Sequence, residues 1–77
     1  MEWVKLTNVR DQLMAEMWVE LLHNDGVPAF TKATDGIAVA YGIPSLSGYW
    51  VMVPDDRRDE AAALLLERTG GEAQIEP

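Results

Sequence analysis

Residues 49–56, with the sequence YWVMVPDD, carry the pattern that decides the fold. The first five residues are all apolar or aromatic, which is typical of a central strand whose two faces are both covered or apolar. Pro54 ends this strand, and Asp55 and Asp56 follow it. Because aspartate is favoured at helix N-caps and glycine just after helix ends, we expect a helix that begins at Asp55 or Asp56 and ends at Gly70-Gly71.

An earlier helix is predicted between Val9 and Asn24. Asn8 is the expected N-cap, and Gly26 the expected left-handed residue after the helix, with Pro28 preventing its continuation. The polar residues of this helix form one narrow wedge. The apolar arc is therefore about twice as wide as the stripe of somewhat over 100° that a helix needs in order to pack on one sheet. We therefore expect a loop, the tail or another chain to cover part of it.

Three more strands are expected, at Trp3–Leu6, Pro28–Ala33 and Ile37–Tyr41, with a tight turn at Asp35-Gly36. The order β-α-β-β-β-α predicts an α+β fold, a ferredoxin-like split β-α-β sandwich with an antiparallel-rich sheet and two helices on one face. Residues 1–69 are expected to form the domain, and residues 70–77 a tail that is a weak edge strand or disordered. Strand alternation predicts which side chains face the helices and which face the open side of the sheet. The first set is Val4, Leu6, Val51 and Val53, and the second is Trp3, Trp50 and Met52.

Composition and charge exclude several classes of function. The chain has 77 residues, a net charge of −7, one histidine and no cysteine. An acidic chain is a poor ligand for nucleic acid or for an anionic membrane surface. The N-terminus lacks the pattern of a signal peptide, and glycines and prolines interrupt the long uncharged stretch from Gly36 to Pro54. We therefore expect a cytoplasmic protein with no nucleic-acid or membrane partner and no disulfide.

The motifs that suggest chemistry are incomplete. Glu20 and His23 have the Glu-x-x-His spacing of di-iron bundles, but such sites need a second copy of the motif. A serine nucleophile needs an adjacent base, and the only histidine is expected on the polar side of the first helix. We expect no catalytic residue, no metal, no cofactor and no enzyme activity.

Excess apolar surface points to binding instead. The candidate interaction residues are Trp3, Trp50 and Met52 on the open sheet face, and Met14 and Trp18 on the first helix. They predict a non-catalytic regulatory or signal-transducing interaction domain, acting through either face, as a homodimer with a further unknown protein partner. The alternative is a small-molecule sensor with a pocket at the glycine-flanked loop of residues 42–48. Its expected ligand contacts are Tyr41, Ser45, Ser47 and Tyr49.

Two segments resemble a known family. They are residues 15–30, AEMWVELLHNDGVPAF, and residues 51–56, VMVPDD, which Ala61, Ala62 and Leu64-Leu65 follow. They are similar to a family of short prokaryotic signal-transducing proteins, formerly a domain of unknown function. The resemblance implies a ferredoxin-like fold similar to the PII nitrogen regulators and a regulatory role, with no catalytic residues to carry over. This chain departs from the pattern between Asp35 and Gly48 and lacks the long basic loop of nucleotide-binding PII regulators, so nucleotide binding is not implied.

Overall fold

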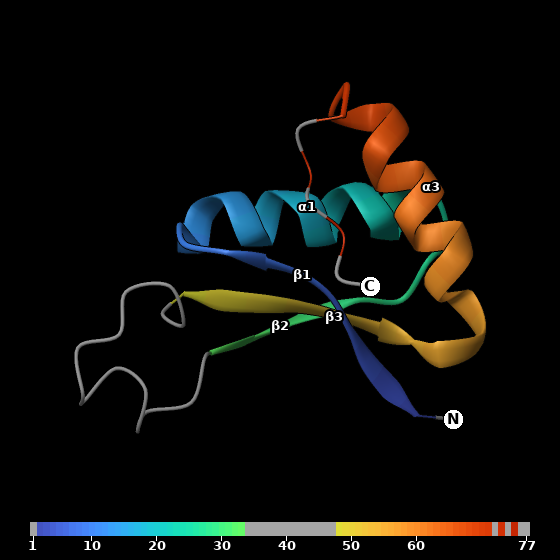
Figure 1. Ribbon diagram of the computed structural model, residues 1–77, viewed down its shortest axis with the longest axis horizontal. Helices are drawn as coiled ribbons and strands as arrows, with labels where there is room; N and C mark the ends of the chain where they lie inside the picture. Colours follow the sequence, from blue (N-terminus) through green and yellow to red (C-terminus); the bar gives the residue numbers. More distant parts are fainter. Residues whose placement is uncertain (1, 34–47, 72, 74, 76–77) are drawn as a thin grey trace.

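A computed structural model describes residues 2–33, 48–71, 73 and 75 (Figure 1). These residues form a small sheet with helices packed on one side of it. In chain order the elements are β1 (Trp3–Val9), α1 (Gln12–Asn24), β2 (Phe30–Ala33), β3 (Tyr49–Pro54), the short 3₁₀ helix η2 (Asp55–Arg57) and α3 (Arg58–Arg68). The expected α+β class is confirmed. The expected strand at residues 37–41 lies outside the described residues.

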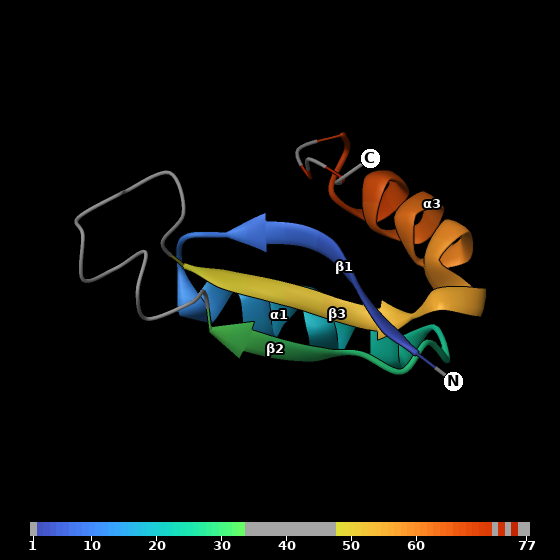
Figure 2. The same ribbon diagram turned by 60° about the horizontal axis from the view of Figure 1, so that its bottom comes forward.

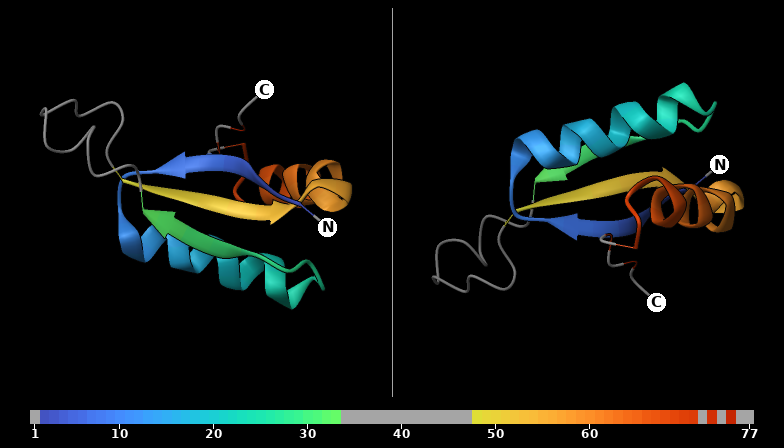
Figure 3. Two further views of the ribbon diagram at one scale, coloured as in Figure 1. Left: turned by 90° about the horizontal axis from the view of Figure 1, so that it is seen from below. Right: turned by 90° about the horizontal axis from the view of Figure 1, so that it is seen from above.

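The sheet has the order β1-β3-β2, and β3 pairs antiparallel with both neighbours. β1 and β2 therefore run in the same direction on either side of β3, and α1 connects them (Figure 2). Both helices lie on one side of the sheet, so among the described residues its other side carries no helix (Figure 3). On the outer side of β1, Ile75 forms a single antiparallel bridge with Thr7.

The core lies between the sheet and the two helices. Leu6, Val51 and Val53 have no exposed surface, and Val4 is half-buried against the core, which agrees with the face predicted for these four residues. From the helices, the fully buried residues are Ala15, Leu22, Ala61 and Leu65. Ala73 is also buried in this core, so part of the C-terminal tail packs on the domain.

The first helix begins later than the sequence suggests. Asn8 was the expected cap, but β1 continues to Val9 because its pairing with β3 extends to Val9 opposite Tyr49. The side-chain amide of Asn8 instead donates a hydrogen bond to the carbonyl of Tyr49, at 3.4 Å. Asp11 takes the N-cap, where its carboxylate accepts from the amide of Leu13 at 3.0 Å. Long-range strand pairing thus outweighed a local capping preference.

A bulge in β1 allows both Leu6 and Thr7 to be buried. The register shifts between Lys5, which is opposite Met52, and Thr7, which is opposite Val51. Leu6 is the extra residue in that interval, and such an insertion locally re-aims the side chains of its strand. As a result, Leu6 and Thr7 are both buried although they are adjacent in the strand.

The two aspartates after β3 do not cap a helix, in contrast to the expectation. The amide of Asp55 donates to the carbonyl of Glu2 at 2.9 Å, so the chain stays tied to β1 as it leaves the sheet. Asp55 and Asp56 then form the first turn of η2, and α3 starts at Arg58 without a side-chain cap. Their charge still lies near the positive end of the helical segment.

Both helices end as predicted, at glycines with positive φ. At the end of α1, the amide of Gly26 (φ 83°) donates to His23 and that of Val27 to Leu22. At the end of α3, the amides of Gly70 and Gly71 donate to Glu67 and Leu66. These paired bonds are the Schellman arrangement, which satisfies carbonyls of the last helical turn.

Candidate interaction surface

The side of the sheet away from the helices gathers most of the predicted sheet-face residues. The pairing register puts Lys5 and Phe30 on either side of Met52, and Asn8 and Lys32 on either side of Trp50. Trp3 lies opposite Pro54 at the end of the sheet. We call this surface the open face and define it by Trp3, Lys5, Asn8, Phe30, Lys32, Trp50 and Met52.

Two aromatic rings meet across β3. The ring centroids of Trp3 and Phe30 are 4.8 Å apart with an interplanar angle of 73°, an edge-to-face contact. Because these residues come from the two outer strands, their rings close over the strand between them. This contact explains why Met52 is only 6% exposed, whereas Trp3 and Phe30 are 42% and 40% exposed. The pair forms one continuous apolar surface, and an edge-to-face contact of this kind is favourable.

Met52 therefore requires a correction to its expected role. The register places it on the open face, as strand alternation predicts, but the two rings cover it. It supports the aromatic pair from below and offers little surface to a partner. Phe30, which the sequence reasoning did not select, provides the exposed apolar surface in its place.

The rest of the open face is cationic. The ammonium nitrogen of Lys5 lies 4.7 Å from the ring centroid of Trp50, within the range of a cation–π contact. Lys32, opposite Trp50 on β2, is exposed. These are both of the lysines in the sequence, and no acidic residue is among the strand residues that the register assigns to this face. A formal charge of +2 thus lies on one face of a chain whose net charge is −7.

The two helix residues predicted for the interaction surface, Met14 and Trp18, lie in the opposite layer from the open face. Trp18 is half-buried and packs against the core, so only part of its side chain is accessible to a partner, and its role in binding stays a prediction. Met14 is exposed, and it shares α1 with two residues that are more exposed, Leu13 (65%) and Met17 (58%). We call Leu13, Met14 and Met17 the α1 stripe.

The predicted ligand loop lies mostly outside the residues that the structure describes. Tyr41, Ser45 and Ser47 lie outside the described residues. Tyr49 is described, and its hydroxyl donates to the side-chain oxygen of Gln12 at 3.4 Å. That bond joins the start of β3 to the start of α1.

The histidine of the sequence takes part in a local backbone contact. Its Nε2 atom lies 2.8 Å from the carbonyl oxygen of Ala29 and 3.2 Å from the amide nitrogen of the same residue. This contact ties the last turn of α1 to the approach of β2. Within the part of the chain that the structure describes, no group of three or more His, Cys, Asp or Glu side chains is placed to hold a metal ion.

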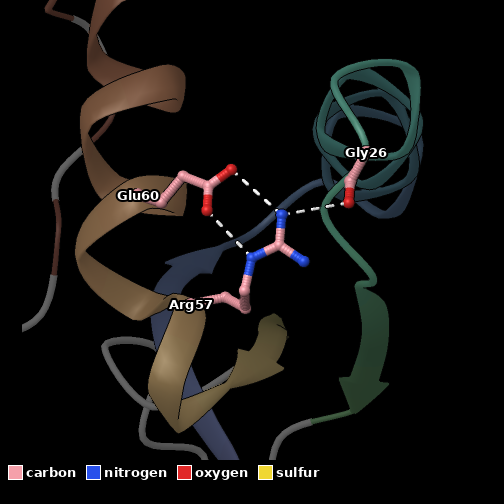
Figure 4. Close-up of polar contacts among 3 residues, drawn as sticks. All are labelled: Gly26, Arg57 and Glu60. Atoms are coloured by element: carbon pink, nitrogen blue, oxygen red, sulfur yellow. Dashed lines mark hydrogen bonds and ion pairs between the residues drawn. The ribbon is translucent and has the colours of Figure 1, made fainter.

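Two arginines link α3 and the preceding turn to the end of α1, and Figure 4 shows the contacts of the first of them, Arg57. Arg57 donates to both carboxylate oxygens of Glu60, at 2.9 and 3.0 Å, and to the carbonyl of Gly26 at 3.1 Å. The hydrogen bond from Arg57 lowers the pKa of Glu60 and raises the pKa of Arg57 itself. Arg68 pairs with Asp25 at 3.0 Å. These pairs join elements within the domain and leave the lysines as the cations of the open face.

In comparisons with known proteins, no protein-family model, no curated protein and no solved structure matched the chain. The family resemblance stays a prediction. No helix in the described parts of the chain is long and apolar enough to cross a membrane.

Proposed function

We propose that this protein is a non-catalytic interaction domain of the regulatory kind, and that it binds a protein partner on the open face. The observation that carries the proposal is the exposed edge-to-face pair of Trp3 and Phe30 on a sheet face that no described helix covers. Aromatic residues are enriched at the energetic centres of protein interfaces because they bury a large area at little entropic cost.

The size of the available burial supports this assignment. A tryptophan or phenylalanine buries 150–250 Å² when fully covered, so rings about 40% exposed leave roughly 150 Å² to bury on the pair. At about 25 cal/mol per Å², covering that area favours binding by about 4 kcal/mol before the cost of association. The α1 stripe has no aromatic residue, and aromatic residues are the ones enriched at the energetic centres of interfaces.

A ferredoxin-like arrangement is the finer fold that we infer. It is supported by the order β1-β3-β2, by the connection of β1 to β2 through α1, and by the bridge from Thr7 to Ile75 on the outer side of β1. A complete strand at the position of Ile75 would give the four-stranded order of that fold. In such a sheet the open face is a broad surface that helices leave free.

Site-specific photo-crosslinking in the native cells tests the proposed surface. A benzoylphenylalanine in place of Phe30 preserves an aromatic ring on the open face, and we expect it to form a covalent adduct with a protein partner. The matched control carries the same group in place of Leu66, which is 41% exposed on α3. An adduct from position 66 alone, or from neither position, would contradict the proposal.

A further inference from the structure

The charge pattern of the open face says what kind of partner it fits, given the proposed function above. Lys5 and Lys32 lie near Trp50 on the two neighbouring strands, and the described strands contain no acidic residue. A partner surface with carboxylates opposite the two lysines should therefore bind this face more tightly than one without them. Electrostatic complementarity of this kind sets partner choice and the rate of association.

A second copy docked face to face is a poor fit. A twofold axis through the open face would bring Lys5 and Lys32 of one copy against the same two residues of the other. Four ammonium groups would then share an interface to which the described strands contribute no carboxylate. Like charges brought together in this way disfavour the complex.

A nucleic acid fits less well than a protein segment. Two lysines neutralise about two phosphates, whereas specific or tight binding needs several such contacts. The strand would also continue past the open face over a molecule that has thirteen acidic and six basic residues. A short peptide avoids that repulsion because its charges are confined to the positions that meet the lysines.

The register sets the spacing between the backbone positions that carry those charges. Lys5 and Lys32 lie on β1 and β2, with β3 between them. Lys5 is opposite Met52 and Lys32 is opposite Trp50, so the two lysines are also offset by two residues along the strand direction. With strands about 4.8 Å apart and about 3.4 Å per residue, their Cα atoms are roughly 12 Å apart. In an extended peptide, residues four apart lie about 13 Å from each other on the same face, with the residue midway between them on that face too.

We propose that the open face binds an extended acidic segment of a partner protein, with acidic residues at positions i and i+4 and an apolar residue at i+2. The two carboxylates pair with Lys5 and Lys32. The apolar side chain between them lies beside Trp50, whose ring the Lys5 ammonium already contacts. The exposed rings of Trp3 and Phe30 provide the adjoining apolar contact.

Fluorescence anisotropy with a labelled peptide of this pattern tests the inference, with leucine at the middle position and serine elsewhere. We expect saturable binding that weakens with added salt and that falls about tenfold for Lys32→Glu, because the substitution replaces an attraction with a repulsion. Lys5→Gln should weaken binding about fivefold, since it removes one charge pair. Circular dichroism of each variant establishes that it is folded.

Two matched controls make the outcome specific. Arg10→Glu changes the net charge by as much as Lys32→Glu at an exposed residue beyond the end of β1, and it should change affinity less than twofold. A peptide with glutamine in place of both acidic residues should bind at least tenfold more weakly.

Four results would overturn the inference. They are no binding of the acidic peptide, equal binding of the glutamine peptide, an equal loss in Arg10→Glu, or tighter binding of labelled oligothymidine than of the peptide. If any of these occurs while position 30 still crosslinks to a protein, the partner chemistry is wrong and the proposed function stands. If position 30 does not crosslink, the proposed function fails as well.

Discussion

Replacing Gly48 with alanine should destabilise the domain severely, whereas the same change at Gly26 should be mild. Both glycines have positive φ, 110° for Gly48 and 83° for Gly26, so alanine is strained at each. Their surroundings differ. A Cβ atom on Gly48 would lie 2.6 Å from the carbonyl oxygen of Val9 and 2.9 Å from the Cα atom of Arg10, whereas a Cβ on Gly26 meets nothing within 4 Å.

The magnitudes follow from these contacts. Backbone strain alone costs roughly 1–2 kcal/mol for alanine at Gly26. At Gly48 a comparable strain is joined by overpacking of about 1–3 kcal/mol, because the clashing atoms belong to the backbone and cannot rotate away. The sum of roughly 2–5 kcal/mol is a large part of the roughly 4–12 kcal/mol expected for a domain of 77 residues.

Urea unfolding followed by the fluorescence of the three tryptophans measures both changes. With a denaturant slope of about 1 kcal/mol per molar urea, Gly26→Ala should lower the midpoint by about 1–2 M. Gly48→Ala should lower it by at least twice as much or prevent folding. Equal midpoints for the two variants would refute the reasoning, because they would mean that the chain at Gly48 moves away from Val9 at little cost.

Three further predictions concern the surfaces and the ion pair. Trp3→Ala should weaken partner binding by about 2 kcal/mol, the value for roughly 100 Å² of exposed ring. A binding titration with the partner that the crosslinking experiment identifies checks this value. An unchanged affinity would count against the open face as the binding surface. The homodimer expected from the sequence should form through the α1 stripe, because a dimer through the open face would bring lysines of the two copies together. Sedimentation velocity should therefore detect a dimer that Met17→Glu converts to monomer. A monomeric parent protein would rule this dimer out. Glu60→Gln should lower stability at neutral pH only, because Arg57 depresses the pKa of Glu60 in the folded protein. The stabilisation by the Arg57–Glu60 pair is complete above the pKa that Glu60 has in the unfolded chain. It disappears as the pH falls through the pKa of Glu60 in the folded protein. Thermal unfolding of both proteins across this pH range should converge in acid, and a difference that persists there would contradict the assignment.

Local sequence signals predicted the ends of the helices and the two faces of the sheet well. Gly26 and Gly70 end their helices because a backbone with positive φ is available to glycine without a steric cost. Leu6, Val51 and Val53 reach the core because side chains alternate across a strand. These features depend on a few adjacent residues, so the sequence is sufficient to predict them.

The starts of the two helices were less predictable. Asn8 and Asp11 both have capping side chains, and the choice between them depends on how far β1 pairs with β3, more than forty residues away in the sequence. Asp55 likewise lies inside the first turn of η2 instead of at its N-cap, and its backbone amide is bonded to Glu2. A local propensity of about 1 kcal/mol is readily outweighed by such long-range pairing.

The sequence by itself determined that this is a small acidic chain with the element pattern of an α+β domain, and it predicted an excess of apolar surface. Only the tertiary structure decided which apolar residues are available for binding. It covered Met52 with the rings of Trp3 and Phe30, packed Trp18 against the core, and placed Lys5 and Lys32 beside Trp50. The physical reason is that exposure and charge complementarity are properties of neighbours across strands. Those neighbours come from segments that the sequence keeps far apart.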